Sequence, residues 1–264
     1  MTPILLLGAG RMGAAMIEGW TRTAAFDPAA LIIREPYPNA TVLEAQRNGA
    51  RLNPPDEVLA EARTVLMALK PQAWREATAG LASSLHPGAV VVSIAAGVPV
   101  RDLAEVFASR PIARVMPTTG VAIAKGVATI VAANPDARAR AHALFDPVAT
   151  TVDLDDEGLI DAATAVSGSA PAYWYALIEA LEAAGEAQGL PPEAARALVR
   201  ATMISAGALL EHTGEEPAEL RRQVTSPGGT TQAALDVLNA EQGFPSLAAE
   251  AVAAAVRRAR ELGG

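Results

Sequence analysis

The first half of the chain alternates two kinds of segment, and this alternation restricts the possible folds more than any other feature. Short aliphatic and β-branched runs are separated by longer Ala/Leu/Glu/Arg stretches with helical spacing. The short runs lack polar alternation, so each is expected to be a strand buried on both faces of a parallel, helix-covered sheet. Repeated β–α units of this length predict a doubly wound α/β domain. The expected strands are Ile4–Leu7, Leu31–Ile33, Thr64–Ala68, Ala89–Ile94, Ile112–Val115, Ala128–Val131 and Thr150–Val152, and the expected helices are Met12–Arg22, Thr41–Arg47, Trp74–Leu81, Arg101–Phe107 and Asp136–Leu144.

The pattern changes near Asp155, beyond which the sequence has no strand-like run and consists of Ala-rich helical segments. Several of these segments begin at a proline and end at a glycine, as helices commonly do. We therefore expect two domains, residues 1–155 and 156–264, in keeping with the length of 264 residues. The helices expected in the second domain cover Pro171–Gly189, Pro192–Thr213, Pro217–Val224, Thr231–Asn239 and Pro245–Leu262.

The segment 192–213 is apolar almost all the way around. Apolar residues line this segment at helical spacing and also occupy its other sides, namely Ala201, Ile204, Ala208 and Leu209 together with Met203, Ala206 and Leu210. A helix of this kind must be covered on all sides, and a second copy of the chain is the simplest cover. We expect a homodimer or larger homo-oligomer formed through the C-terminal helices; the alternative is a single Ala-rich monomeric bundle.

Composition excludes several classes of protein. The absence of cysteine excludes disulfides, thiolate nucleophiles and Cys-ligated metal centres, and we expect no metal site. The net charge of −8 and the lack of a dense Lys/Arg run argue against a nucleic-acid partner. The apolar N-terminal run has no basic flank, and no segment suits a membrane span. We therefore expect a cytoplasmic protein with no membrane partner.

Three glycines follow the first expected strand and open the first expected helix. Gly8 permits a tight turn, Gly10 allows the backbone to approach a pyrophosphate, and Gly13 allows close helix–strand packing. The N-terminus of the helix offers N–H donors and a partial positive charge to the phosphates. This context favours a nicotinamide dinucleotide over a purely structural glycine turn.

The end of the second strand carries Arg34 and Glu35 side by side. A carboxylate at this place accepts hydrogen bonds from a ribose 2′-OH, whereas an arginine favours a 2′-phosphate. The pair therefore supports both NAD and NADP. Two further strand ends, Ala68–Pro71 and Ile94–Gly97, are expected to line the same groove, because ligands bind beyond the carboxyl ends of strands in such sheets. The alternative is that Pro71 and Gly97 only shape ordinary loops and contact no cofactor.

Two motifs in the second half are more specific than the glycine loop. These are Ser167-Gly-Ser-Ala-Pro-Ala-Tyr173 and Val224-Thr-Ser-Pro-Gly-Gly-Thr-Thr231. Together with the segments above, and in the same order along the chain, they resemble the Δ1-pyrroline-5-carboxylate reductase family. The resemblance implies a Rossmann-like domain followed by an all-helical substrate-binding and dimerisation domain. It also implies NAD(P)H-dependent reduction of a cyclic imino acid to L-proline, with NADP the expected cofactor and NAD the alternative.

The resemblance also implies site residues. Thr231 and Ser226 are the expected catalytic residues, with the Thr231 hydroxyl at the imine nitrogen. The expected substrate-binding residues are Ser226, Gly228, Gly229, Thr230 and Thr231. The expected cofactor-binding residues, from the motif and the resemblance together, are Leu7, Gly8, Ala9, Gly10, Arg11, Met12, Gly13, Arg34, Glu35, Asp56, Ala68, Leu69, Lys70, Pro71, Ala95, Ala96, Gly97 and Glu157.

The sequence departs from the family pattern in two places. The usual Met-Pro-Asn-Thr-Pro is replaced by Met116-Pro-Thr118-Thr-Gly120, so that a hydroxyl stands for an amide and a glycine for a rigid proline. Ala170 stands where glycine is usual. The first departure bears on substrate range and rate, and it keeps other imine reductases open as an alternative function.

The chemistry agrees with the residue types present. An imine nitrogen is basic, so its protonated form needs only a hydrogen-bonding hydroxyl or water, and the cofactor supplies the hydride. A β-hydroxyacid dehydrogenase of similar plan places a lysine on the long helix, but Pro171–Gln188 contains none. Besides another imine reductase, a further alternative is a non-catalytic NAD(P)-binding regulator.

Overall fold

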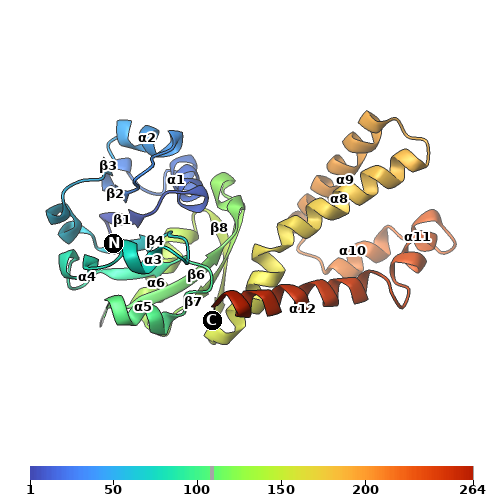
Figure 1. Ribbon diagram of the computed structural model, residues 1–264. Coiled ribbons are helices and arrows are strands. Elements are labelled where there is room, and N and C mark those ends of the chain that lie inside the picture. Colours follow the sequence, from blue (N-terminus) through green and yellow to red (C-terminus); the bar gives the residue numbers. More distant parts are fainter. Residues whose placement is uncertain (108–109, 264) are drawn as a thin grey trace. The chain divides into compact units, whose positions relative to one another are not determined.

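One mixed β-sheet organises the N-terminal part of the chain. In the computed structural model, which describes residues 1–107 and 110–263, eight strands pair in the order β3-β2-β1-β4-β5-β6-β7-β8 (Figure 1). Residues 108, 109 and 264, which belong to the expected domains, lie outside the described residues. The strands are β1 Ile4–Leu7, β2 Leu31–Arg34, β3 Arg51–Leu52, β4 Thr64–Met67, β5 Val90–Ser93, β6 Ile112–Pro117, β7 Gly126–Val131 and β8 Ala149–Leu154.

The expectation of a wholly parallel sheet is wrong at one pairing. β7 runs antiparallel to β6, while β8 is parallel to β7 and the remaining pairs are parallel. The connection between β6 and β7, residues 118–125, is shorter than the dozen or so residues that a parallel crossover needs. β7 and β8 are joined instead through a helix, α6 Pro135–Phe145, which permits a parallel crossover.

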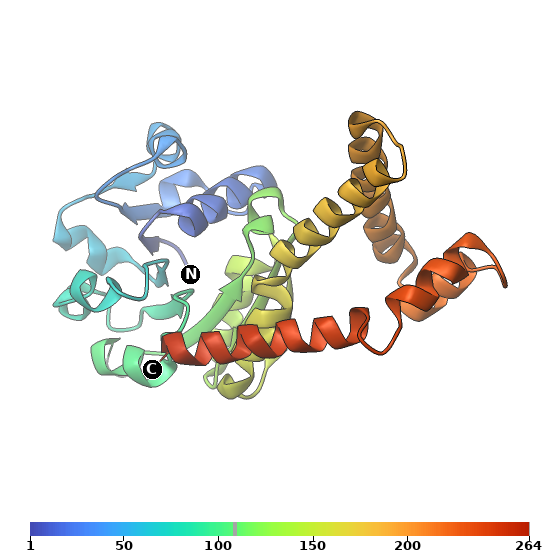
Figure 2. The same ribbon diagram turned by 45° about the vertical axis from the view of Figure 1, so that its right-hand side comes forward.

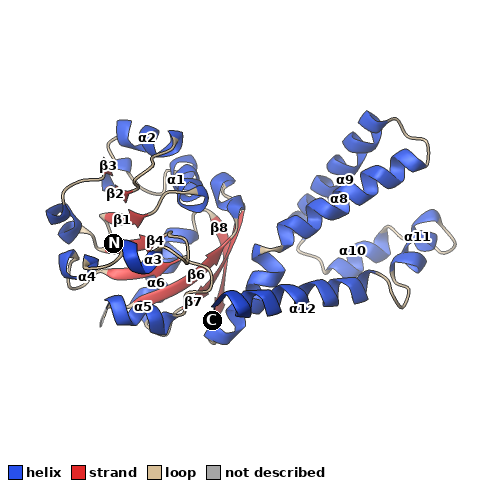
Figure 3. Ribbon diagram, viewed as in Figure 1, coloured by secondary structure: helices blue, strands red, loops and turns tan. Residues whose placement is uncertain are grey.

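The sheet is buried on both faces, as the uniform apolar strands predict. Ile4 and Leu6 of β1 belong to one core cluster, whereas Leu5 and Leu7 belong to a second. The first cluster packs under α1, α2 and α6, and the second under α3 and α5, so helices cover both faces (Figure 3). These helices and the other short helical elements are α1 Arg11–Thr23, η1 Pro28–Ala30, α2 Ala40–Arg47, η2 Asp56–Glu61, α3 Trp74–Ala77, α4 Leu81–Ser84, α5 Val100–Phe107, η3 Thr119–Ile123, η4 Glu157–Leu159, α7 Ile160–Ala163 and a π-helical turn over Thr164–Gly168.

Two local features differ from the sequence-based expectation. The helix expected over Trp74–Leu81 is divided into α3 and α4, because Gly80 adopts a left-handed backbone with φ of 74°. The short strand β3 was not expected, since a two-residue strand at a sheet edge has no detectable periodicity.

The chain separates into two compact units by its internal contacts. The first comprises Met1–Gly168 together with Val256–Gly264, and the second comprises Ser169–Ala255. The second unit contains helices and no strand in the described residues, and its first two helices pack against each other (Figure 2). Its helices are α8 Ala170–Ala187, α9 Pro192–Thr213, α10 Pro217–Gln223 and α11 Thr230–Leu238, followed by α12 Phe244–Gly263, which ends in the first unit.

The second unit has almost no interior of its own. Ala195 is its only fully buried residue among those described, while Ile204 and Val237 remain 72% and 73% exposed. None of the described helices combines the length and apolarity that crossing a bilayer would require.

Candidate functional site

The carboxyl ends of the central strands form one edge at which most of the expected cofactor residues meet. The strand register pairs Leu7 with both Arg34 and Met67, and it pairs Met67 with Ser93. β1 lies between β2 and β4. The chain continues from β1 to β2 and β3 on one side and from β4 to β5 on the other, so the edge above β1 and β4 is the switch point of the fold. Open α/β sheets bind their ligands at such a point.

The glycine loop at this edge requires glycine at two positions for packing. Gly8 has a φ of 82°, and a Cβ built on it would lie 2.9 Å from the carbonyl oxygen of Ala68. A Cβ on Gly13 would lie 2.5 Å from the carbonyl oxygen of Gly8. These contacts confirm that the turn and the close helix–strand approach both depend on missing side chains.

Gly10 has a different environment. A Cβ built there would have no atom within 4 Å among the described residues, so no packing reason for this glycine is found in the chain itself. Gly10 is the N-cap of α1, whose first turn has no acidic residue and no side-chain cap. Open space above a bare helix N-terminus suits a pyrophosphate, because the phosphates can approach the free N–H groups. The loop therefore fits a dinucleotide.

The adjoining surface forms a pocket of about 330 Å³ beside the loop. Its lining combines an apolar floor with two charged residues, and consists of Leu7, Gly8, Arg34, Glu35, Pro36, Asn53, Leu69 and Ala77. Apolar side chains and a few placed polar groups are the usual lining of a small-molecule site. This pocket lies where the adenosine half of a dinucleotide is expected.

Glu35 is fixed against the glycine loop. Its carboxylate accepts the N–H of Ala9 at 2.7 Å and the N–H of Tyr37 at 2.9 Å. Its main chain exchanges two hydrogen bonds of 2.9 Å with the side chain of Asn53. The neighbouring guanidinium of Arg34 is paired with the carboxylate of Asp56.

The other two strand ends complete the groove. The N–H of Ala68 donates to the carbonyl oxygen of Leu7 at 2.8 Å, which joins the two strand ends directly. Lys70 is exposed beyond that point and Pro71 is half-buried. In the third strand end, Ala95 is buried, Ala96 is exposed and Gly97 turns the chain with a φ of 70°.

Glu157 lies at the far end of the same groove. One carboxylate oxygen accepts the N–H of Val100 at 2.9 Å and the guanidinium of Arg114 at 2.9 Å. The register pairs Arg114 with Ser93, which brings it to the same edge. Gly97, Arg114 and Glu157 line a second pocket of about 330 Å³. Glu157 therefore anchors the first turn of α5, which follows the cofactor segment.

The two replaced residues of segment 116–120 have separate explanations. Thr118 is buried, and its hydroxyl accepts the N–H of Val127 at 2.9 Å, so it fixes the start of the β6–β7 connection. A Cβ on Gly120 would lie 2.6 Å from the carbonyl oxygen of Lys125. Glycine is thus required in this tight connection, and a proline in the same backbone would clash.

The expected substrate residues lie in one loop of the second unit and in the first turn of the helix that follows it. Ser226 is exposed, Gly228 has a φ of 70°, and the N–H of Gly229 donates to the carbonyl oxygen of Ser226 at 3.0 Å. The loop ends at the N-terminus of α11, which begins at Thr230 and has no side-chain cap. Free N–H groups at a helix N-terminus favour a carboxylate.

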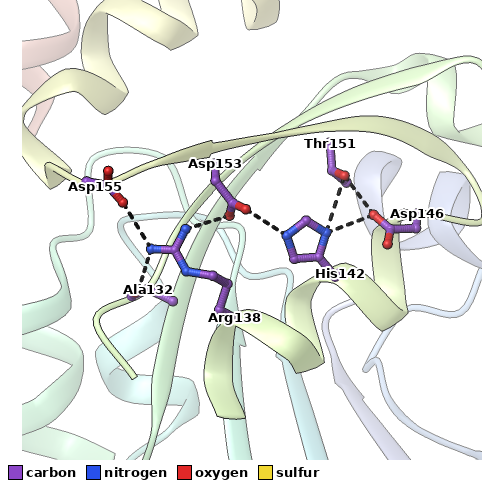
Figure 4. Close-up of polar contacts among 7 residues, drawn as sticks. All are labelled: Ala132, Arg138, His142, Asp146, Thr151, Asp153 and Asp155. Carbon is purple, nitrogen blue, oxygen red and sulfur yellow. Dashed lines mark hydrogen bonds and ion pairs between the residues drawn. The ribbon is translucent and has the colours of Figure 1, made fainter. Parts of the chain in front are cut away.

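A separate polar cluster connects α6 to β8 (Figure 4). The two ring nitrogens of His142 lie 3.0 Å from carboxylate oxygens of Asp146 and Asp153. Hydrogen bonding to Asp146, and secondarily to Asp153, raises the pKa of His142 against an opposing effect of burial. Arg138 also pairs with Asp153 at 2.9 Å. The cluster joins a helix to an edge strand and lies among none of the expected site residues.

Three supporting residues were not expected from the sequence. Asn39 caps α2 through its oxygen and donates to the carbonyl of Ala9 at 2.8 Å. Asn53 holds Glu35, and Arg114 holds Glu157. Arg114 had a detectable signal, namely a charged residue inside an otherwise apolar strand. The two asparagines act through main-chain groups and leave no comparable pattern.

The doubly wound sheet, with a glycine loop at its switch point and an anchored groove along the strand ends, defines a dinucleotide-binding oxidoreductase of the Rossmann class. Residues 3–97 match a family model described as NADP oxidoreductase, coenzyme F420-dependent, and residues 157–262 match pyrroline-5-carboxylate reductase dimerisation. The chain belongs to the pyrroline-5-carboxylate reductase family, since it is 37% identical to the pyrroline-5-carboxylate reductase of Synechocystis sp. over 98% of this chain and 97% of that one.

Solved structures agree with this assignment. A pyrroline-5-carboxylate reductase from Coxiella burnetii superposes with a TM-score of 0.91 at 27% identity, covering 100% of this chain and 99% of the other. A pyrroline carboxylate reductase from Plasmodium falciparum with NADP bound gives a TM-score of 0.83 at 25% identity, covering 100% and 98%.

Proposed function

We propose that this chain reduces Δ1-pyrroline-5-carboxylate to L-proline with NAD(P)H. The observation that carries the proposal is the match to a curated pyrroline-5-carboxylate reductase over nearly the whole of both chains. The groove described above supports it independently, because its open Gly10, its pocket and its strand ends suit a dinucleotide. The NADP-bound relative supports the same cofactor class.

The first unit holds the cofactor. The N–H groups at the start of α1 bind the pyrophosphate, and the pocket beside Glu35 takes the adenosine. Ala68–Pro71 and Ala95–Gly97 extend the groove toward the nicotinamide, and Glu157 fixes the turn that follows. When bound, the dihydronicotinamide supplies the hydride that reduces the imine carbon.

The loop 226–231 holds the substrate. The main-chain N–H groups at the start of α11 bind the carboxylate, with Ser226 and Gly228–Thr230 shaping the turn. The oxygen of the Thr231 hydroxyl accepts a hydrogen bond from the protonated ring nitrogen and keeps the imine oriented. Orientation accounts for much of the catalysis here, since the protonated imine needs no strong acid.

Replacement of one hydroxyl tests this assignment. Thr231→Ala is expected to lower kcat about 10- to 100-fold while the dissociation constant for NADP⁺ stays the same, because the hydroxyl meets only the substrate. Thr231→Ser should restore most of the rate. Thr213→Ala is a matched control, since that hydroxyl bonds main-chain groups at the end of α9: it donates to the carbonyl of Leu209 and accepts the N–H of Glu215. Unchanged turnover in Thr231→Ala would remove the proposed role.

Two negative results would distinguish the alternatives. Binding of the dinucleotide without oxidation of NAD(P)H in the presence of pyrroline-5-carboxylate would favour a non-catalytic regulator. Oxidation with other cyclic imines, but not with this substrate, would favour a different imine reductase.

We also propose that the helical C-terminal domain expected from the sequence, residues 156–264, forms a homodimer or larger homo-oligomer. The match to a dimerisation family and the exposed apolar side chains of α9 support this. Ile204→Asp should shift the sedimentation coefficient toward that of a single chain, because the charge would be buried between copies. Leu43→Asp on α2, an exposed leucine of the first unit, should leave assembly unchanged. A wild-type monomer would instead support the single-bundle alternative.

A further inference from the structure

We infer that Arg34, Glu35 and Asp56 read the 2′ position of the adenosine ribose, and that the two carboxylates oppose a 2′-phosphate so that the chain binds NAD at least as tightly as NADP. This inference rests on the dinucleotide site of the proposed function. It resolves the ambiguity of the adjacent arginine and glutamate, whose residue types alone support both cofactors.

The position of Glu35 comes from its hydrogen bonds. The residue follows β2 directly, and its carboxylate is held 2.7 Å from the main-chain nitrogen of Ala9, between two glycines of the loop. The residue after the second strand meets the ribose hydroxyls in folds of this kind. Glu35 is thus held at the ribose end of the loop and cannot turn away without losing two N–H donors.

Glu35 keeps capacity for the ribose. An ionised carboxylate has about four lone-pair sites, and the N–H groups of Ala9 and Tyr37 use two of them. The remaining sites can accept hydrogen bonds from a 2′-OH and a 3′-OH. A phosphate at the 2′ position has no proton to donate when fully ionised and would repel the carboxylate.

Arg34 is the cation that could bind a 2′-phosphate, but it is already paired. Its guanidinium contacts the carboxylate of Asp56, and its side chain is only 32% exposed. Asp56 is 73% exposed and lines a neighbouring pocket of about 330 Å³ together with Arg34. To reach a phosphate, Arg34 would have to give up this partner or share it.

The net charge around the ribose site decides which of the two cofactors is favoured. Among the described residues that line the two pockets, Arg34 is the only cation, and Glu35 and Asp56 are the only anions. The cluster therefore carries a charge of −1 before a ligand binds, and a 2′-phosphate adds about −1.5 to −2. A free ribose hydroxyl adds none. The charges favour the unphosphorylated cofactor.

Equilibrium binding tests the inference without catalysis. Isothermal titration calorimetry with NAD⁺ and NADP⁺, in the absence of substrate, should give wild-type dissociation constants that are equal or lower for NAD⁺. Asp56→Asn should tighten NADP⁺ about 3- to 10-fold and leave NAD⁺ unchanged, because it frees Arg34. Glu35→Gln should tighten NADP⁺ about tenfold and weaken NAD⁺. Arg34→Gln should weaken NADP⁺ alone.

A matched control is available on the same 3-10 helix as Asp56. Glu61 pairs with Arg51 and lines neither pocket, so Glu61→Gln should leave both dissociation constants unchanged. If Glu35→Gln disturbs the loop and loses both dinucleotides, Asp56→Asn decides the question, because its exposed carboxylate makes no main-chain hydrogen bond among the described residues.

Two outcomes would overturn the inference. In the first, the wild type binds NADP⁺ at least tenfold more tightly than NAD⁺. In the second, the ratio of the two dissociation constants is the same in Asp56→Asn and in Glu35→Gln as in the wild type. A chain that shows the expected binding but does not reduce pyrroline-5-carboxylate would overturn the proposed function and leave this inference intact.

Discussion

Arg114 donates to Glu157 at 2.9 Å, and this ion pair links β6 to the turn that follows β8. The arginine side chain is only 6% exposed, and its Nε has no hydrogen-bond partner among the described residues. The same Glu157 oxygen also accepts the N–H of Val100. One carboxylate thus neutralises a buried charge and fixes the start of α5.

Removal of that carboxylate should destabilise the first unit and loosen the cofactor groove. Glu157→Ala leaves Arg114 buried without its partner, and we expect a loss of about 2–3 kcal/mol in the free energy of unfolding, since Glu157 itself is partly exposed. Urea unfolding measures this. Asp155→Ala, which removes a fully exposed carboxylate 3.6 Å from Arg138, should leave the free energy of unfolding almost unchanged. Equal costs for the two variants would contradict the assigned role.

Valine substitutions should separate the two functions of the glycine loop. Gly10→Val has room in the folded chain, so the melting temperature should hold while NADP⁺ binding is lost to steric block. Gly13→Val places a side chain against the carbonyl of Gly8, so it should lower the melting temperature as well. Thermal unfolding and calorimetric titration distinguish them, and retained affinity in Gly10→Val would refute the loop assignment.

Trp20 provides a test of the core that packs under α1. Its side chain is 1% exposed, and its indole N–H donates to the carbonyl oxygen of Leu144 at 2.8 Å, near the end of α6. Trp20→Phe removes the donor and leaves that carbonyl unpaired, so we expect a loss of about 1–3 kcal/mol in unfolding free energy. Chemical denaturation measures it. A neutral substitution would indicate that water replaces the indole.

His142 should make stability depend on pH in a defined direction. Its pKa in the folded chain is raised, chiefly by hydrogen bonding to Asp146. The resulting stabilisation is fully present below the ordinary pKa of 6.5 and is lost as the pH rises through the folded-state value. The melting temperature of the wild type should therefore be higher than that of His142→Gln, and this difference should be larger at about pH 5.5 than at about pH 8.5.

A second histidine controls for general effects of pH. His212 lies in the last turn of α9 and is not a member of the cluster of His142. His212→Gln removes a histidine without touching the carboxylates around His142, so it measures the general effect of such a replacement at the two pH values. A His142 variant that differs from the wild type equally at both values would contradict the proposed cause.

The sequence was sufficient for features that depend on local pattern. The central strands were predictable because burial on both faces requires uniform apolar runs. The glycine loop was predictable because Gly8 and Gly13 meet local steric needs and Gly10 leaves room for a ligand. The direction of β7 was not predicted, although the short segment 118–125 carried the information. Gly80 likewise divides a helix that periodicity alone had made continuous.

Other features depend on residues far apart in the chain. The bond between Arg114 and Glu157 spans 43 positions, and that between Ala9 and Glu35 spans 26. These partners are too far apart in the chain for a local sequence pattern to connect them. The sequence therefore shows the type of each residue but not the residue that it contacts. The assignments of Ser226 and Thr231 rest on family resemblance and stay predictions for the variants described above.

The hydrogen bond from Ala9 to Glu35 has a consequence for ligand capture. The loop acquires its shape from the protein's own carboxylate, so the conformational entropy of ordering it is lost when the chain folds and not when a dinucleotide arrives. Such preorganisation favours rapid association with little structural rearrangement.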